Sequence, residues 1–100
     1  MKKLLFLVCF ASSAFALEPT FERQTELQNL LKNDCGACHG LTLQGGLGSA
    51  LKPENLLGKS DAYLIDVITN GRKETAMPPW KPFLNQNDVA WLVHFLKNPN

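Results

Sequence analysis

The stretch Cys35-Gly36-Ala37-Cys38-His39 decides how the rest of the chain is interpreted. Two cysteines three residues apart lie on one face of a helical turn, so both thiols can reach the two vinyl groups of one porphyrin. The histidine that follows can then bind the iron. The motif therefore predicts one haem c, covalently attached through Cys35 and Cys38, with His39 as an axial ligand of the iron.

Three other kinds of site can use such a pair of cysteines. A thioredoxin-like redox motif requires a βαβ setting, and the sequence has no strand pattern. A structural disulfide suits an oxidising compartment, but it leaves His39 and Met77 without a role. Zinc requires four ligands, and the consecutive Cys38 and His39 are awkward on one tetrahedral ion. Haem attachment explains more of the chain than these alternatives do.

Residues 1–16 have the features of an export signal. Lys2 and Lys3 give a positive start, residues 4–11 are almost entirely apolar, and residues 14–16 place small side chains where a signal peptidase cuts. The apolar run is too short to serve as a permanent membrane anchor. We predict a signal peptide at 1–16, one haem-binding domain at 17–100 and a periplasmic location.

Two alternatives remain open at this end of the chain. Cleavage can also follow Ala14, and Cys9 can in principle carry a lipid anchor, although Val8 stands where a small residue is preferred. Cutting after Ala16 removes two lysines and changes the formal net charge from +1 to −1. Such a near-neutral chain indicates no nucleic-acid partner.

The second axial ligand has few candidates, because the exported part keeps only His39, His94 and Met77. A lone methionine is usually core filler. Met77, however, lies in a segment that three prolines hold stiff, and a thioether suits a haem iron. His94 lies opposite the apolar stripe of its predicted helix, so we expect it to face solvent. We favour Met77; His94 or an empty position is the alternative.

Hydrophobic periodicity predicts three helices. They span about 21–33, 61–70 and 86–97. The expected capping residues are Thr20, Ser60 and Gly71, and the pair Asn85 and Asp88 forms a capping box.

Residues 40–59 have no clear period but contain several leucines. We expect this long loop to wrap around the haem with its leucines pointing inward. The fold class predicted from these patterns is all-α, with three to four short helices around one covalently attached haem and a long central loop.

The haem motif, the leucine-rich segment after it and the Met77 loop together resemble a small class I cytochrome c fold, over essentially all of the exported part. The resemblance implies that the last helix packs across the first and that His39 and Met77 are the axial ligands. It also implies that the carbonyl of Ser49 accepts the N–H of His39. Leu31 stands where the family usually has an aromatic side chain.

Within this class, residues 35–43, 45–48 and 77–84 are similar to cytochrome c55X, a periplasmic cytochrome associated with dissimilatory nitrite reductase. The resemblance implies a monohaem one-electron carrier, not an enzyme, that donates electrons to nitrite reductase. The alternative is a redox or chaperone factor in maturation of the nitrite reductase haem. A peroxidase is a third class, and it requires Met77 to leave the iron. We expect a monomer whose exposed haem edge, near Ala37, Pro78 and Pro79, docks a redox partner.

Overall fold

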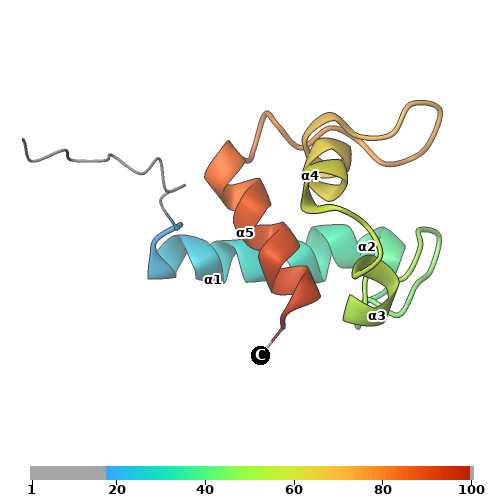
Figure 1. The fold of residues 1–100 in the computed structure, drawn as a ribbon, viewed down its shortest axis with the longest axis horizontal. Coiled ribbons are helices and arrows are strands. Elements are labelled where there is room, and N and C mark those ends of the chain that lie inside the picture. Colours follow the sequence, from blue (N-terminus) through green and yellow to red (C-terminus); the bar gives the residue numbers. More distant parts are fainter. Residues whose placement is uncertain (1–17, 100) are drawn as a thin grey trace, which may run out of the picture.

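The structure, a computed structural model, describes residues 18–99, and the predicted signal peptide at 1–16 lies outside them. The described part is helical and contains no strand. Its elements are α1 (Phe21–Leu30), a π-helical turn (Leu31–Cys35), α2 (Gly36–His39), α3 (Pro53–Leu56), α4 (Asp61–Asn70) and α5 (Gln86–Lys97) (Figure 1). None of these helices is long and apolar enough to cross a membrane. The predicted all-α class is confirmed.

The first three elements follow one another without a break, so the haem motif lies on the end of a single long helix. The sequence placed the end of this helix near Asn33, and it continues instead to His39. In the π-helical turn the N–H of Gly36 bonds to the carbonyl of Leu31, five residues earlier. A π turn inserts one extra residue and rotates the following side chains relative to α1. The direction in which the side chains of Cys38 and His39 leave the helix therefore depends on this turn.

The bounds of α4 and α5 agree with those that the sequence predicted, because their ends are encoded locally. The Ser60 hydroxyl accepts from the N–H of Tyr63 at the start of α4. Asn85 and Asp88 form the expected capping box of α5, each side chain bonded to the backbone N–H of the other. Capping satisfies N–H groups that have no partner within the helix.

The central loop differs from its prediction in two ways. It contains the single-turn helix α3, and Leu41 and Leu57 are exposed, so the expectation of inward leucines is wrong for these two. Neighbouring residues of a helical turn point about 100° apart, so the burial of Leu56 turns Leu57 outward. Leu41 lies in a tight turn that the bond from the N–H of Leu43 to the carbonyl of Gly40 closes.

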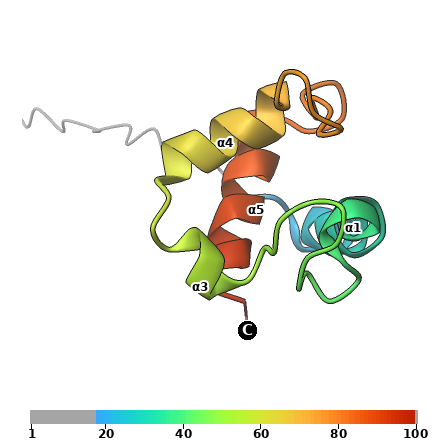
Figure 2. The same cartoon turned by 90° about the vertical axis from the view of Figure 1, so that its right-hand side faces the viewer.

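The core lies where α5 crosses α1 (Figure 1), and Figure 2 shows α3 and α4 on the other side of α5. The inner face of α5 packs with Leu27 and Leu31 of the long helix, as the resemblance implied. The buried cluster consists of Leu27, Leu31, Leu56, Leu84, Val89, Leu92 and Leu96. Truncating one such leucine to alanine typically costs about 2–5 kcal/mol of stability.

Candidate functional site

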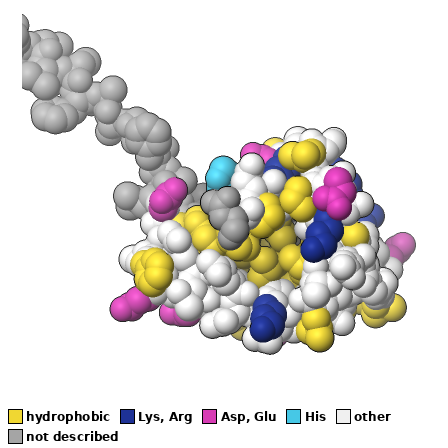
Figure 3. All heavy atoms as spheres, turned by 90° about the horizontal axis from the view of Figure 1, so that it is seen from below, with side chains coloured by type: hydrophobic (Ala, Val, Ile, Leu, Met, Phe, Trp, Pro, Cys, Tyr) yellow, Lys and Arg dark blue, Asp and Glu magenta, His cyan; other side chains and the backbone are white. Residues whose placement is uncertain are grey.

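A cavity of about 360 Å³ opens between the long helix, α4 and the segment that follows α4. The structure brings all four residues of the predicted site to its walls: Cys35, Cys38, His39 and Met77. Most of the remaining lining is apolar, and includes Leu31, Leu47, Leu51, Leu56, Leu64, Val67, Ile68, Pro78, Trp80, Leu92 and Leu96. Figure 3 shows one face of the protein, where hydrophobic side chains gather around a hollow.

Cys35 and Cys38 are both free thiols, each partly buried. Burial, helped by the negative charge of Asp34, raises the pKa of the Cys35 thiol to about 11. This thiol is therefore protonated at neutral pH. Within residues 18–99 no group of three or more His, Cys, Asp and Glu side chains could hold a metal ion, so that part offers no zinc site of the kind considered above.

The imidazole of His39 is held in one tautomer by the loop that follows it. Its Nδ1 atom lies 2.6 Å from the carbonyl oxygen of Ser49. A carbonyl can only accept, so Nδ1 carries the proton and donates, and Nε2 keeps its lone pair. The contact that the resemblance implied is present. Such a bond orients a ligating histidine and raises its basicity.

Gly48 lets this loop come close to the imidazole. A Cβ atom at position 48 would lie 2.7 Å from Cε1 and 2.8 Å from Nδ1 of His39, which is closer than real Cβ contacts. The N–H of Gly48 also bonds to the carbonyl of Cys38 at 2.7 Å. The absence of a side chain at Gly48 is therefore needed for the position of the His39 ring.

Met77 reaches the cavity from the segment after α4. Its carbonyl accepts from the N–H of Arg72 at 3.1 Å, and its N–H donates to the Thr75 hydroxyl at 3.3 Å. Gly71 has a φ of +71°, and a Cβ there would lie 2.7 Å from the Met77 carbonyl oxygen. These contacts close a short loop whose end places the thioether at the cavity wall.

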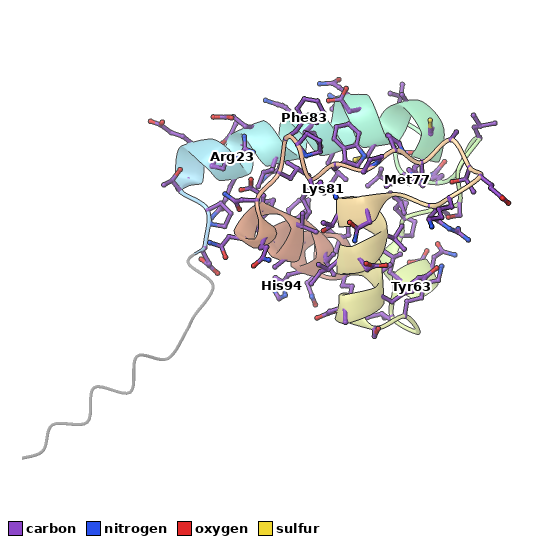
Figure 4. The ribbon with its side chains drawn as sticks, turned by 90° about the horizontal axis from the view of Figure 1, so that it is seen from above. Arg23, Tyr63, Met77, Lys81, Phe83 and His94 are labelled. Atoms are coloured by element: carbon purple, nitrogen blue, oxygen red, sulfur yellow. The ribbon has the colours of Figure 1, made fainter. Side chains whose placement is uncertain are left out.

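His94 lies elsewhere. It is exposed on α5 and does not line the cavity. In Figure 4 its label and that of Met77 lie far apart. The expectation that His94 faces solvent is confirmed.

Two cations complete the lining. Lys59, just before α4, and Arg72, just after it, both border the cavity. The sequence did not predict either residue as part of the site. No periodic pattern marks either residue, since both lie in irregular segments. Tyr63 of α4 lines the cavity as well, although it is exposed.

This set of groups fits a haem. The macrocycle is a broad apolar surface with two vinyl groups, two carboxylates and an iron that binds imidazole and thioether ligands. The cavity offers apolar walls, two thiols, one imidazole nitrogen with its lone pair, one thioether and two cations. Each part of the group has a counterpart among the lining residues.

Comparison with known proteins assigns the family. The family model described as "Cytochrome C oxidase, cbb3-type, subunit III" matches residues 22–96. The chain is 44% identical over 92 residues to "Cytochrome c55X" of Paracoccus denitrificans, covering 92% of this chain and 89% of the relative.

Two solved structures are also similar. The "c-type cytochrome NirC" has a TM-score of 0.78 and 49% identity, covering 79% of this chain and 93% of that protein. The "Dihydro-heme d1 dehydrogenase NirN in complex with DHE" has a TM-score of 0.66 and 33% identity, and the match covers 73% of this chain but 16% of that protein. The chain therefore belongs to the c-type cytochromes, electron-transfer proteins that contain haem c, and within them to the cytochrome c55X group.

Proposed function

We propose that this chain binds one haem c through thioether bonds from Cys35 and Cys38, with His39 and Met77 as axial ligands, and carries single electrons to a dissimilatory nitrite reductase in the periplasm. The observation that carries the proposal is that Cys35, Cys38, His39 and Met77 all line the same cavity. The haem supplies an iron that changes between the +2 and +3 states.

The residues around the cavity have separate roles in this proposal. The thiols of Cys35 and Cys38 would hold the haem by adding across its vinyl groups, with the S–H bond replaced by a C–S and a C–H bond. His39 Nε2 and the Met77 thioether would hold the iron, and the Ser49 carbonyl keeps the imidazole in the tautomer that this requires. Lys59 and Arg72 are the cations available to the two haem carboxylates.

Two protein ligands leave the iron no open position, which argues for electron transfer over catalysis on small molecules. The thioether ligand favours the reduced iron. Ala37, Pro78 and Pro79 are exposed on segments that border the cavity, and we place the redox partner at these apolar residues. Electron-transfer encounters usually bury a small area and are short-lived. Residues 1–16 serve in this proposal as the export signal, removed before the protein acts as a monomer.

Anaerobic stopped-flow mixing of the reduced holoprotein with oxidised nitrite reductase, followed by visible absorption, tests the donor role. Oxidation at least as fast as nitrite turnover supports it. Slow or absent transfer with an intact haem rules it out.

A second candidate is a redox or chaperone role in maturation of the nitrite reductase haem. The match to part of a dihydro-heme d1 dehydrogenase favours it. A dehydrogenation releases electrons, and a one-electron carrier of this type can accept them. The two roles differ in the direction of electron flow. Reduction of the oxidised holoprotein by the dehydrogenase with its substrate supports the second role, and stoichiometric tetrapyrrole binding supports a chaperone.

A further inference from the structure

Arg23 makes a set of contacts that neither the haem motif nor the capping pattern explains. From α1 its guanidinium donates to both carboxylate oxygens of Asp88 on α5, at 3.3 Å from Nε and 2.9 Å from Nη2. Nη2 also donates to the backbone carbonyl of Phe83 at 3.2 Å. Figure 4 shows Arg23 and Phe83 close together. One side chain thus joins α1, α5 and the segment that leads from Met77 to α5.

The Asp88 end of this contact is fixed. Its side chain is 3% exposed, and one of its oxygens also accepts from the N–H of Asn85. Asp88 is the one buried charged residue among those the structure describes. Arg23, whose side chain is 33% exposed, is therefore anchored by a rigid two-point bond to Asp88. Its Nη2 atom also donates to the Phe83 carbonyl, and its Nη1 atom donates to Glu26 on the same helix at 2.9 Å.

The segment between Met77 and α5 is held at two places. Near Met77, the N–H groups of Trp80 and Lys81 bond to the carbonyls of Ile68 and Thr69 at the end of α4. Beyond them, the Arg23 bond to Phe83 and the buried side chain of Leu84 attach the segment to the long helix and the core. The first anchor ties the backbone near Met77 to α4, and the Arg23 bond ties the backbone of the same segment to the helix that carries His39.

We infer that Arg23 is a positioning residue for Met77: it fixes the Met77 segment to the helix that bears His39, and so keeps the thioether on the iron. The inference rests on the proposed ligation by Met77. An external ligand such as imidazole can bind the iron only when Met77 has left it. Its apparent affinity therefore scales with the population of that open state.

The test is titration of the ferric holoprotein with imidazole, followed by visible absorption. We expect Arg23→Gln to raise the apparent imidazole affinity about tenfold. The charge-assisted hydrogen bond from Arg23 to the Phe83 carbonyl stabilises only the state in which Met77 binds the iron, and the substitution removes it. Arg23→Lys keeps the charge but not the fork that reaches Asp88 and Phe83 together, so we expect an intermediate rise.

Lys97→Gln is the matched control. Lys97 also makes a short ion pair, 2.6 Å to Asp61, and donates to the Lys59 carbonyl, but it joins α5 to the start of α4 and makes none of the bonds that hold the Met77 segment. We expect its imidazole affinity to stay within about twofold of the parent. Equal affinities for the Arg23→Gln and Lys97→Gln proteins, or a loss of stability in Arg23→Gln without a change in affinity, would overturn the inference.

Met77→Ala separates this inference from the ligand assignment. If Met77 is the ligand, the Met77→Ala protein binds imidazole most tightly, and adding Arg23→Gln to it has no further effect. If Met77→Ala leaves the affinity unchanged, the ligand assignment fails, and the role of Arg23 fails with it. If the Arg23 effect persists in full without Met77, the assignment stands and only the positioning role is overturned.

Discussion

The Nδ1 atom of His39 lies 2.6 Å from the carbonyl oxygen of Ser49, ten residues further along the chain. This contact joins the end of the long helix to the loop that follows it. It leaves Nε2 with a lone pair for the iron, whichever redox state the iron adopts. The geometry of the loop thus decides which atom of His39 is available.

Gly48 provides the most direct test of this loop. In Gly48→Ala the new methyl group would meet the His39 ring at 2.7 Å, so the ring or the loop must shift. We expect a loss of about 1–3 kcal/mol of holoprotein stability in denaturant unfolding, together with a changed redox midpoint. Gly58→Ala is the control, because a Cβ at position 58 would meet nothing within 4 Å. Equal effects of the two substitutions would contradict the role given to Gly48.

Gly71 is expected to matter for the other ligand. Its φ of +71° is unfavourable for alanine, and a Cβ would lie 2.7 Å from both the Met77 carbonyl oxygen and the Pro78 carbonyl carbon. Gly71→Ala should cost about 1–3 kcal/mol and displace Met77. Carbon monoxide binding to the reduced holoprotein measures the displacement. A protein that still excludes carbon monoxide would show that the Met77 loop tolerates the strain.

Substitution of Met77 and of His94 distinguishes the two candidates for the second axial ligand. Met77→Ala should lower the redox potential and open the iron to carbon monoxide, because in the proposed ligation the thioether stabilises the reduced iron and occupies its sixth position. His94→Ala should leave both unchanged, since His94 is exposed and does not line the cavity. Redox titration and carbon monoxide binding of the two proteins decide the matter. A lowered potential in His94→Ala alone would reverse the assignment.

Asp88 is expected to make the stability of the folded protein depend on pH. Burial acts to raise the pKa of its carboxyl group, but the hydrogen bonds from Arg23 and Asn85 outweigh it and hold the pKa below the ordinary value. A carboxyl group with a lowered folded-state pKa stabilises the fold above its unfolded pKa of about 3.9, and this contribution is lost as the pH falls below that value.

Asp88→Asn isolates this contribution. We expect the parent holoprotein to be more stable by about 1–3 kcal/mol from pH 5 to 7, and the difference to shrink below about pH 4, where the carboxyl group of Asp88 becomes protonated in the unfolded chain before it does so in the folded protein. Denaturant unfolding at each pH measures it, and titration of the haem carboxylates affects both proteins alike. A difference that stays constant down to pH 3 would contradict the lowered pKa.

Arg23 and Asp88 also show what sequence patterns leave out. Asp88 was recognised as a capping residue, but its burial was not predicted. A signal was present: Asp88 lies four residues before Leu92, on the apolar face of α5, and a charged residue on such a face needs a buried partner. Nothing in the sequence identified Arg23, on α1, as that partner.

The sequence by itself determined the features that depend on neighbouring residues. The bounds of α4 and α5 follow from caps three residues apart, and the haem motif is a contiguous string whose spacing suits one porphyrin. Its match to the family covers most of the chain, so the helical class was predicted correctly.

Only the tertiary structure decided which distant residues share the cavity. It brought Met77 to the same cavity as His39, and it placed Lys59 and Arg72 at the lining. It also extended the first helix through a π-helical turn and left Leu41 and Leu57 of the loop exposed. These outcomes depend on how α4, α5 and the irregular segments pack together, and packing between residues far apart in sequence leaves no periodic trace in the chain.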